Sequence, residues 1–161
     1  MYNPATMTRP EILMSRYKRH NATENKVLIG LIAKHPEIMI FDQYNTESII
    51  KKRIELNRGK MILFLDAMTP NFTTKGNHRK IEFLLVDTEG NHTWIDAKHA
   101  HTTTNITDLH GEYNRTSKCK GRVHFVVDGE GYCDKVIKEH RKFLKKAKLN
   151  SVSVLRLAEY F

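Results

Sequence analysis

The chain has 161 residues, of which 40% are hydrophobic and 28% are charged, so it is long enough for one globular domain and too short for two. The 27 Lys and Arg residues outnumber the 18 Asp and Glu residues, and the resulting net charge of +9 favours a polyanionic partner. No stretch approaches the roughly 18 consecutive apolar residues of a membrane span, and the first residues lack the basic-then-apolar order of a signal peptide. These features predict a protein without a membrane partner that acts inside the cell.

The N-terminal part is expected to contain a basic arm and then a helix, in a single domain that spans residues 1–161. Residues 1–20 form the arm and include a short helix that starts at a capping-box motif. Residues 21–35 have the apolar spacing of a second helix, which places Glu24 on the stripe predicted to be buried. A capping contact within the first turn is the alternative role of Glu24.

The rest of the chain alternates between strand and helix patterns. The expected elements are a helix over 46–58, strands over 61–66, 80–87 and 92–98, a helix over 105–116, a strand over 122–128, a strongly basic helix over 134–148 and a strand over 151–157. From the helix at 21–35 onward, the core order is αβββαβ, followed by a C-terminal αβ unit. This order predicts the α/β (α+β) class, with a mixed central sheet flanked by helices.

A short turn over 88–90 joins the second and third strands. A three-residue loop with Gly90 in the left-handed conformation is a favoured hairpin connection. It places Glu82 directly opposite Asp96, and directly opposed residues share a face with Cβ atoms about 4.5–5.5 Å apart. Lys98 lies two residues further along on the same face. A loop of two or four residues would shift the register by one and move Glu82 to the other face.

Two carboxylates on an apolar surface repel each other unless a proton or a cation lies between them. Mg²⁺ prefers one or two carboxylate ligands, with water and substrate phosphate in its remaining positions. We therefore expect Glu82 and Asp96 to bind Mg²⁺, with Mn²⁺ as a substitute. Lys98 would then hold a phosphate or help to deprotonate an attacking water. A structural ion-pair cluster is the alternative interpretation.

The segments Ile81-Glu82-Phe-Leu-Leu and Trp94-Ile-Asp96-Ala-Lys98, joined by a short turn, resemble the PD-(D/E)xK nucleases. This superfamily includes many type II restriction endonucleases and Holliday-junction resolvases. The resemblance implies a restriction-endonuclease-like core of helix, three strands, helix and strand. It also implies catalytic roles for Glu82, Asp96 and Lys98, and products that carry 5′-phosphates.

The same resemblance implies that a glutamate of the first helix joins the site, a position that Glu24 matches. The family usually has Pro followed by Asp where this chain has Ile81 and Glu82, so Asp66 and Asp87 are substitutes for the second-strand acidic residue. The helix after the third strand often supplies a further polar residue, for which Asp108 and Glu112 have suitable spacing.

Several basic side chains near this region are candidates for contact with nucleic acid. They are Lys75, Arg79, His99, His101 and Arg115. His99 and His101 are predicted to lie on opposite sides of an extended chain, where they contact phosphate or face solvent. A zinc site is the other interpretation of the local histidines, although no cysteine–histidine spacing of a structural zinc module is present.

These observations predict a metal-dependent DNA endonuclease of the restriction or junction-resolving kind. A protein of this size is expected to act as a homodimer, because a two-fold substrate favours a two-fold protein. The expected location is the cytoplasm or nucleoid, or the host cell if the gene belongs to a phage. The alternatives are a non-catalytic nucleic-acid-binding domain of the same fold and an RNA endonuclease.

Overall fold

The structure is a computed structural model that describes residues 22–70, 80–102 and 109–161. Its elements are α2 (Ala22–Lys34), β1 (Met39–Phe41), α3 (Glu47–Leu56), β2 (Ile62–Met68), β3 (Lys80–Val86), β4 (His92–His99), α4 (His110–Thr116), β5 (Arg122–Asp128), the 3₁₀ helix η2 (Glu130–Tyr132), α5 (Asp134–Lys146), β6 (Val152–Arg156) and α6 (Leu157–Tyr160). The predicted arm, Lys75, Arg79 and Asp108 lie outside the described residues. None of the helices in the described ranges is long and apolar enough to cross a membrane.

The six strands form one mixed sheet in the order β1-β2-β3-β4-β5-β6. Strands β2, β3 and β4 are an antiparallel meander, whereas the β1–β2, β4–β5 and β5–β6 pairs are parallel. The parallel pairs are joined through α3, α4 and α5, as parallel connections require. The predicted class, a mixed α/β sheet flanked by helices, is confirmed.

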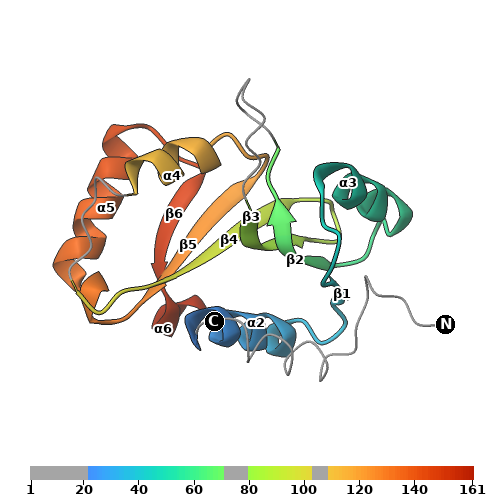
Figure 1. Cartoon of the computed structure of the whole chain (residues 1–161), viewed down its shortest axis with the longest axis horizontal. Helices are drawn as coiled ribbons and strands as arrows, with labels where there is room; N and C mark the ends of the chain where they lie inside the picture. The colour runs from blue at the N-terminus through green and yellow to red at the C-terminus, as the bar shows by residue number, and fades with distance from the viewer. Residues whose placement is uncertain (1–21, 71–79, 103–108) are drawn as a thin grey trace.

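Helices cover both faces of this sheet (Figure 1). Helix α2 packs on one face, where Leu28 and Phe83 belong to the same buried apolar cluster. Helices α3, α4 and α5 pack on the other face, where Ile50, Tyr113 and Ile137 belong to a second cluster. The sheet is therefore buried on both sides, which explains why its strands read as nearly continuous apolar runs.

Three short elements, β1, η2 and α6, were not predicted, and one helix begins later than expected. Strand β1 has three residues and α6 has four, which is too short for a recognisable hydrophobic period. Helix α4 begins at His110, within the range predicted as 105–116. Helix α3 matches the helix expected over 46–58, and together with the unpredicted β1 it lies between α2 and the three-stranded meander.

Helix α5 matches the predicted basic helix and ends at Lys146. Its buried positions are Val136, Ile137, His140 and Leu144, which recur at helical spacing on one face. The lysines between them are exposed. Asp134 in the first turn and the lysines of the last turn complement the helix dipole.

Candidate functional site

The β3–β4 hairpin has the predicted register. Phe83 pairs with Ile95, so the preceding residue Glu82 lies opposite Asp96. Gly90 closes the turn with a φ of 85°, a left-handed conformation that glycine adopts without steric cost. The expected three-residue loop is confirmed, and with it the meeting of the two carboxyl groups.

Glu82 and Asp96 form a hydrogen-bonded carboxylate pair at the centre of the site. The side chain of Asp96 is buried and that of Glu82 is half-buried. Burial raises the pKa of Glu82 to about 9, with further contributions from the charge of Asp96 and its hydrogen bond. Burial also raises the pKa of Asp96, an effect that the charge of Lys98 opposes. In the absence of a cation, the carboxylate pair therefore retains a proton at neutral pH.

Lys98 lies beside the carboxylate pair and connects it to helix α4. Its Nζ atom is 3.6 Å from Oδ1 of Asp96 and 2.9 Å from Oε1 of Glu112. Burial alone would lower the pKa of Lys98, but the combined charges of Asp96, Glu112 and Glu82 and the Glu112 hydrogen bond raise it. Lys98 is therefore a fixed positive charge in this arrangement. The contact with Glu112 is the polar contribution expected from the helix after the third strand.

The other acidic candidates differ in their relation to the carboxylate pair. Glu24 is half-buried in the first turn of α2, and its charge contributes to the raised pKa of Glu82. Asp66 lies opposite Glu82 across β2 and β3, with a left-handed φ of 51° that aspartate tolerates better than most residues. Asp87 instead closes the hairpin turn, where Oδ1 accepts N–H hydrogen bonds from Glu89 and Asn91 at 2.9 Å. Of the two substitutes, only Asp66 is placed near the pair.

The buried oxygen of Asp96 tests whether this site fits a cation. Oδ1 of Asp96 is buried and receives no hydrogen bond within the described part of the chain, and its ion pair with Nζ of Lys98 is long, at 3.6 Å. An under-coordinated carboxylate oxygen beside a protonated partner is a suitable ligand for a hard divalent cation. Among the described residues, no three His, Cys, Asp or Glu side chains are grouped to hold a metal. A cation held by Glu82 and Asp96 would thus depend on water or substrate for its other ligands.

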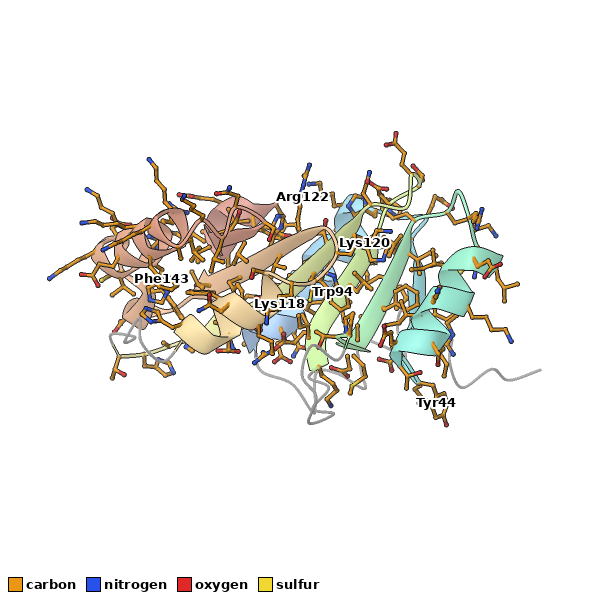
Figure 2. All side chains as sticks on the ribbon, turned by 90° about the horizontal axis from the view of Figure 1, so that it is seen from above. Tyr44, Trp94, Lys118, Lys120, Arg122 and Phe143 are labelled. Atoms are coloured by element: carbon orange, nitrogen blue, oxygen red, sulfur yellow. The ribbon has the colours of Figure 1, made fainter. Side chains whose placement is uncertain are left out.

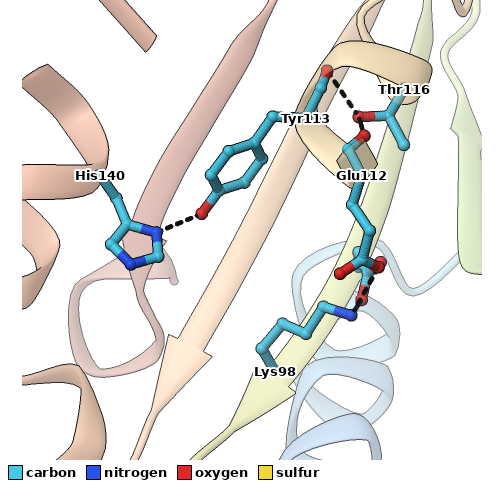
Figure 3. A network of polar contacts seen from close by, with 6 residues as sticks. Lys98, Glu112, Tyr113, Thr116 and His140 are labelled. Carbon is cyan, nitrogen blue, oxygen red and sulfur yellow. Dashed lines mark hydrogen bonds and ion pairs between the residues drawn. The ribbon is translucent and has the colours of Figure 1, made fainter. Parts of the chain in front are cut away.

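A buried hydrogen bond fixes helix α4, which carries Glu112, against helix α5 (Figure 3). The hydroxyl of Tyr113 lies 2.6 Å from Nδ1 of His140, and both side chains are fully buried. Burial lowers the pKa of His140, so its imidazole is neutral and Nδ1 can accept a hydrogen bond from the Tyr113 hydroxyl. This contact spans 27 positions of sequence and has no local signal, so sequence reasoning could not find it.

The substitution Tyr113→Phe is expected to lower the free energy of unfolding by about 1–3 kcal/mol, because it leaves a buried imidazole nitrogen without a partner. Urea denaturation at pH 7.5 measures this loss. Tyr44→Phe is the matched control, since Tyr44 is 61% exposed and its change should stay within about 0.5 kcal/mol. Equal stability of both variants would show that the hydrogen bond does not stabilise the fold.

A groove lies next to the carboxylate pair on the same face of the sheet. Leu84 follows Glu82 by two positions on β3, and its partner Trp94 precedes Asp96 by two positions on β4; both line a cavity of about 460 Å³. Its charged lining residues are Glu47, Lys51, Glu55, Arg58 and Lys120. Figure 2 shows Lys118, Lys120 and Arg122 in the segment from α4 to β5, near Trp94. No sequence pattern predicts this groove, because its walls come from separate elements.

The described candidates for nucleic-acid contact occupy different surroundings. Arg115 is half-buried on α4, and its Nε atom has no hydrogen-bond partner among the described residues. His99 and His101 are both exposed, and their Nε2 atoms are 3.3 Å apart. The prediction that these two side chains lie on opposite sides was wrong, since residues i and i+2 of an extended chain share a side.

Comparisons of the chain with protein-family models, curated proteins and solved structures find no match.

Proposed function

We propose that this protein is a divalent-metal-dependent endonuclease that hydrolyses phosphodiester bonds in DNA. The observation that carries the proposal is the carboxylate pair: Glu82 and Asp96 share a proton at a half-buried position, and one Asp96 oxygen has no hydrogen-bond partner among the described residues. Such a pair is unstable as two charges and becomes stable when a cation replaces the proton. Lys98 beside it has the acidic-x-Lys spacing of the PD-(D/E)xK nucleases.

In this proposal Glu82 and Asp96 would hold Mg²⁺ or Mn²⁺. When bound, the cation supplies positive charge for phosphate oxygens and lowers the pKa of water. Lys98 provides a second, permanent positive charge that orients the scissile phosphate, and Glu112 holds its ammonium group in place. Because the pKa of Lys98 is raised, we assign it a role in binding and orientation and not in proton abstraction.

DNA as the substrate is supported by charge and by the position of the groove. The chain has a net charge of +9, and Lys51, Arg58 and Lys120 line the groove beside the carboxylate pair. Basic side chains along a groove neutralise backbone phosphates and position a nucleic acid without reading its sequence. A homodimer would present two such sites to the two strands of a duplex.

The experiment is incubation of the purified protein with supercoiled plasmid and with a synthetic four-way junction, each in Mg²⁺ and in EDTA. We expect cleavage in Mg²⁺ and none in EDTA, because the carboxylate pair needs a cation to act on a phosphodiester. The substrate that is cut distinguishes a general or restriction-like nuclease from a junction-resolving one.

Absence of cleavage on both substrates, in Mg²⁺ and in Mn²⁺, would contradict the proposal. If DNA binding then persisted and weakened steeply with salt, the protein would be a nucleic-acid-binding domain without catalysis. The close contact between Lys98 and Glu112 is the observation that favours this second function, since an ion pair can be purely structural. A single-stranded RNA substrate in the same assay tests for ribonuclease activity.

A further inference from the structure

His99 and His101 form a second cluster of ligand-type side chains at the end of β4. Their rings are in edge contact, with centroids 4.5 Å apart, and their Nε2 atoms face each other at 3.3 Å. Both side chains are exposed to solvent. Two facing imidazole nitrogens repel each other when both carry lone pairs, so either the N–H of one ring donates to the other nitrogen or a cation lies between them.

The backbone between the two histidines is hydrogen-bonded to the neighbouring segment that runs from the end of β5 into η2. The N–H of Ala100 donates to the carbonyl of Asp128 at 3.2 Å, and the carbonyl of Ala100 accepts from the N–H of Gly131 at 2.8 Å. The ring of His99 also lies against Gly129, where an added Cβ would be 2.9 Å from Cε1 of the ring. The backbone that carries the two imidazoles is therefore ordered, and the ring of His99 also packs against Gly129.

A buried hydroxyl group lies beside Nδ1 of His99, the ring nitrogen that does not face His101. Oγ1 of Thr23, on the first turn of α2, lies 3.4 Å from Nδ1 of His99, and Thr23 is only 1% exposed. When Nδ1 donates its proton to this hydroxyl, Nε2 is unprotonated and faces His101. Histidines that bind metals are commonly oriented by a hydrogen bond of this kind from the other ring nitrogen.

We infer that His99 and His101 form a binding site for a transition-metal cation of the Zn²⁺ class, separate from the carboxylate pair. Two imidazole nitrogens on a tetrahedral Zn²⁺, each about 2.0–2.1 Å from the metal, are about 3.3–3.4 Å apart. The observed Nε2–Nε2 distance of 3.3 Å matches this separation. Within the described residues no third His, Cys, Asp or Glu side chain completes the group, so water or a bound molecule supplies the other ligands.

The proposed site connects two elements that are distant in sequence. Thr23 contacts His99 from α2, while His99 is the last residue of β4 and His101 follows it by two positions. A cation here would fix both imidazoles and strengthen the contact with the first turn of α2, which also carries Glu24. Zn²⁺ is therefore expected to raise the melting temperature, because a ligand that binds only the folded state stabilises that state.

Titration calorimetry of the untagged, EDTA-treated full chain with Zn²⁺ tests this inference, and the visible absorption of added Co²⁺ reports imidazole ligation. We expect the double variant His99→Ala/His101→Ala to lose at least ~10-fold in Zn²⁺ affinity and Thr23→Val to lose about 10-fold. His35→Ala is the matched control, since His35 is a half-exposed histidine outside the cluster, and it should bind like the wild type.

Equal Zn²⁺ affinity of the wild type and the double variant would overturn the inference. So would a loss of Zn²⁺ binding in Asp96→Asn together with normal binding in the double variant, because the ion would then occupy the carboxylate pair. Circular dichroism of each variant ensures that a lost signal does not reflect unfolding. Neither result depends on cleavage, so failure of this inference leaves the proposed nuclease activity to be judged by its own assay.

Discussion

The substitution Asp96→Asn is expected to reduce metal-dependent DNA cleavage by at least ~10²–10³-fold, the scale of losing one preorganised electrostatic group. Asparagine has the volume of aspartate but no negative charge, so its amide oxygen is a much weaker ligand of a divalent cation than the carboxylate. Asp96 is 6% exposed and is not among the residues that line the groove, so most of the affinity for DNA should remain. Plasmid cleavage and DNA affinity, measured at one fixed salt concentration, separate the two effects.

Glu89→Gln is the matched control for this experiment. Glu89 lies in the exposed turn of the same hairpin, and its substitution also converts a carboxylate to an amide. It should cleave DNA like the wild type. The single variant Lys98→Ala should lose cleavage activity as Asp96→Asn does, because both side chains belong to the same site. Retained cleavage in both variants would contradict the assignment of the site to these residues.

The centre of the candidate site could be predicted because its geometry depends on local sequence. The turn over 88–90, with Gly90 in the left-handed position, sets the register of β3 and β4 and so brings Glu82 opposite Asp96. The position of Lys98 then follows from the two-residue period of a strand. Local turn chemistry and strand alternation were sufficient here, and no long-range information was needed.

The support of the site depends on contacts that local patterns do not contain. Glu112 had suitable spacing, but its contact with Lys98 depends on how α4 packs on the sheet. The hydrogen bond between Tyr113 and His140 joins two helices through the core. In the sequence, His140 cannot be distinguished from the exposed polar residues of α5, so its burial was not predictable. The left-handed backbone of Asp66 is likewise a tertiary effect within an otherwise regular apolar strand.

The proton shared by the carboxylate pair makes stability depend on pH in a direction that can be measured. The pKa of Glu82 is raised from 4.5 to about 9, so the folded state holds more protons than the unfolded state between these values. The free energy of unfolding contributed by this group therefore decreases as pH rises across that interval. Glu82→Gln has no proton to lose, so it should exceed the wild type in stability at pH 9 by on the order of 1–3 kcal/mol.

Urea denaturation in EDTA at pH 6, 7.5 and 9 measures this difference, with Glu89→Gln as the control that should follow the wild-type profile. Parallel profiles for the wild type and Glu82→Gln would show that Glu82 does not hold the proton.

Addition of Mg²⁺ is an independent test of the same carboxylate pair, because a cation that binds both carboxylates must displace the proton. Titration calorimetry in two buffers of different ionisation enthalpy should therefore detect proton release from the wild type at pH 7.5. Glu82→Gln should release fewer protons, since Glu82 is absent and only Asp96 remains to exchange a proton for the cation.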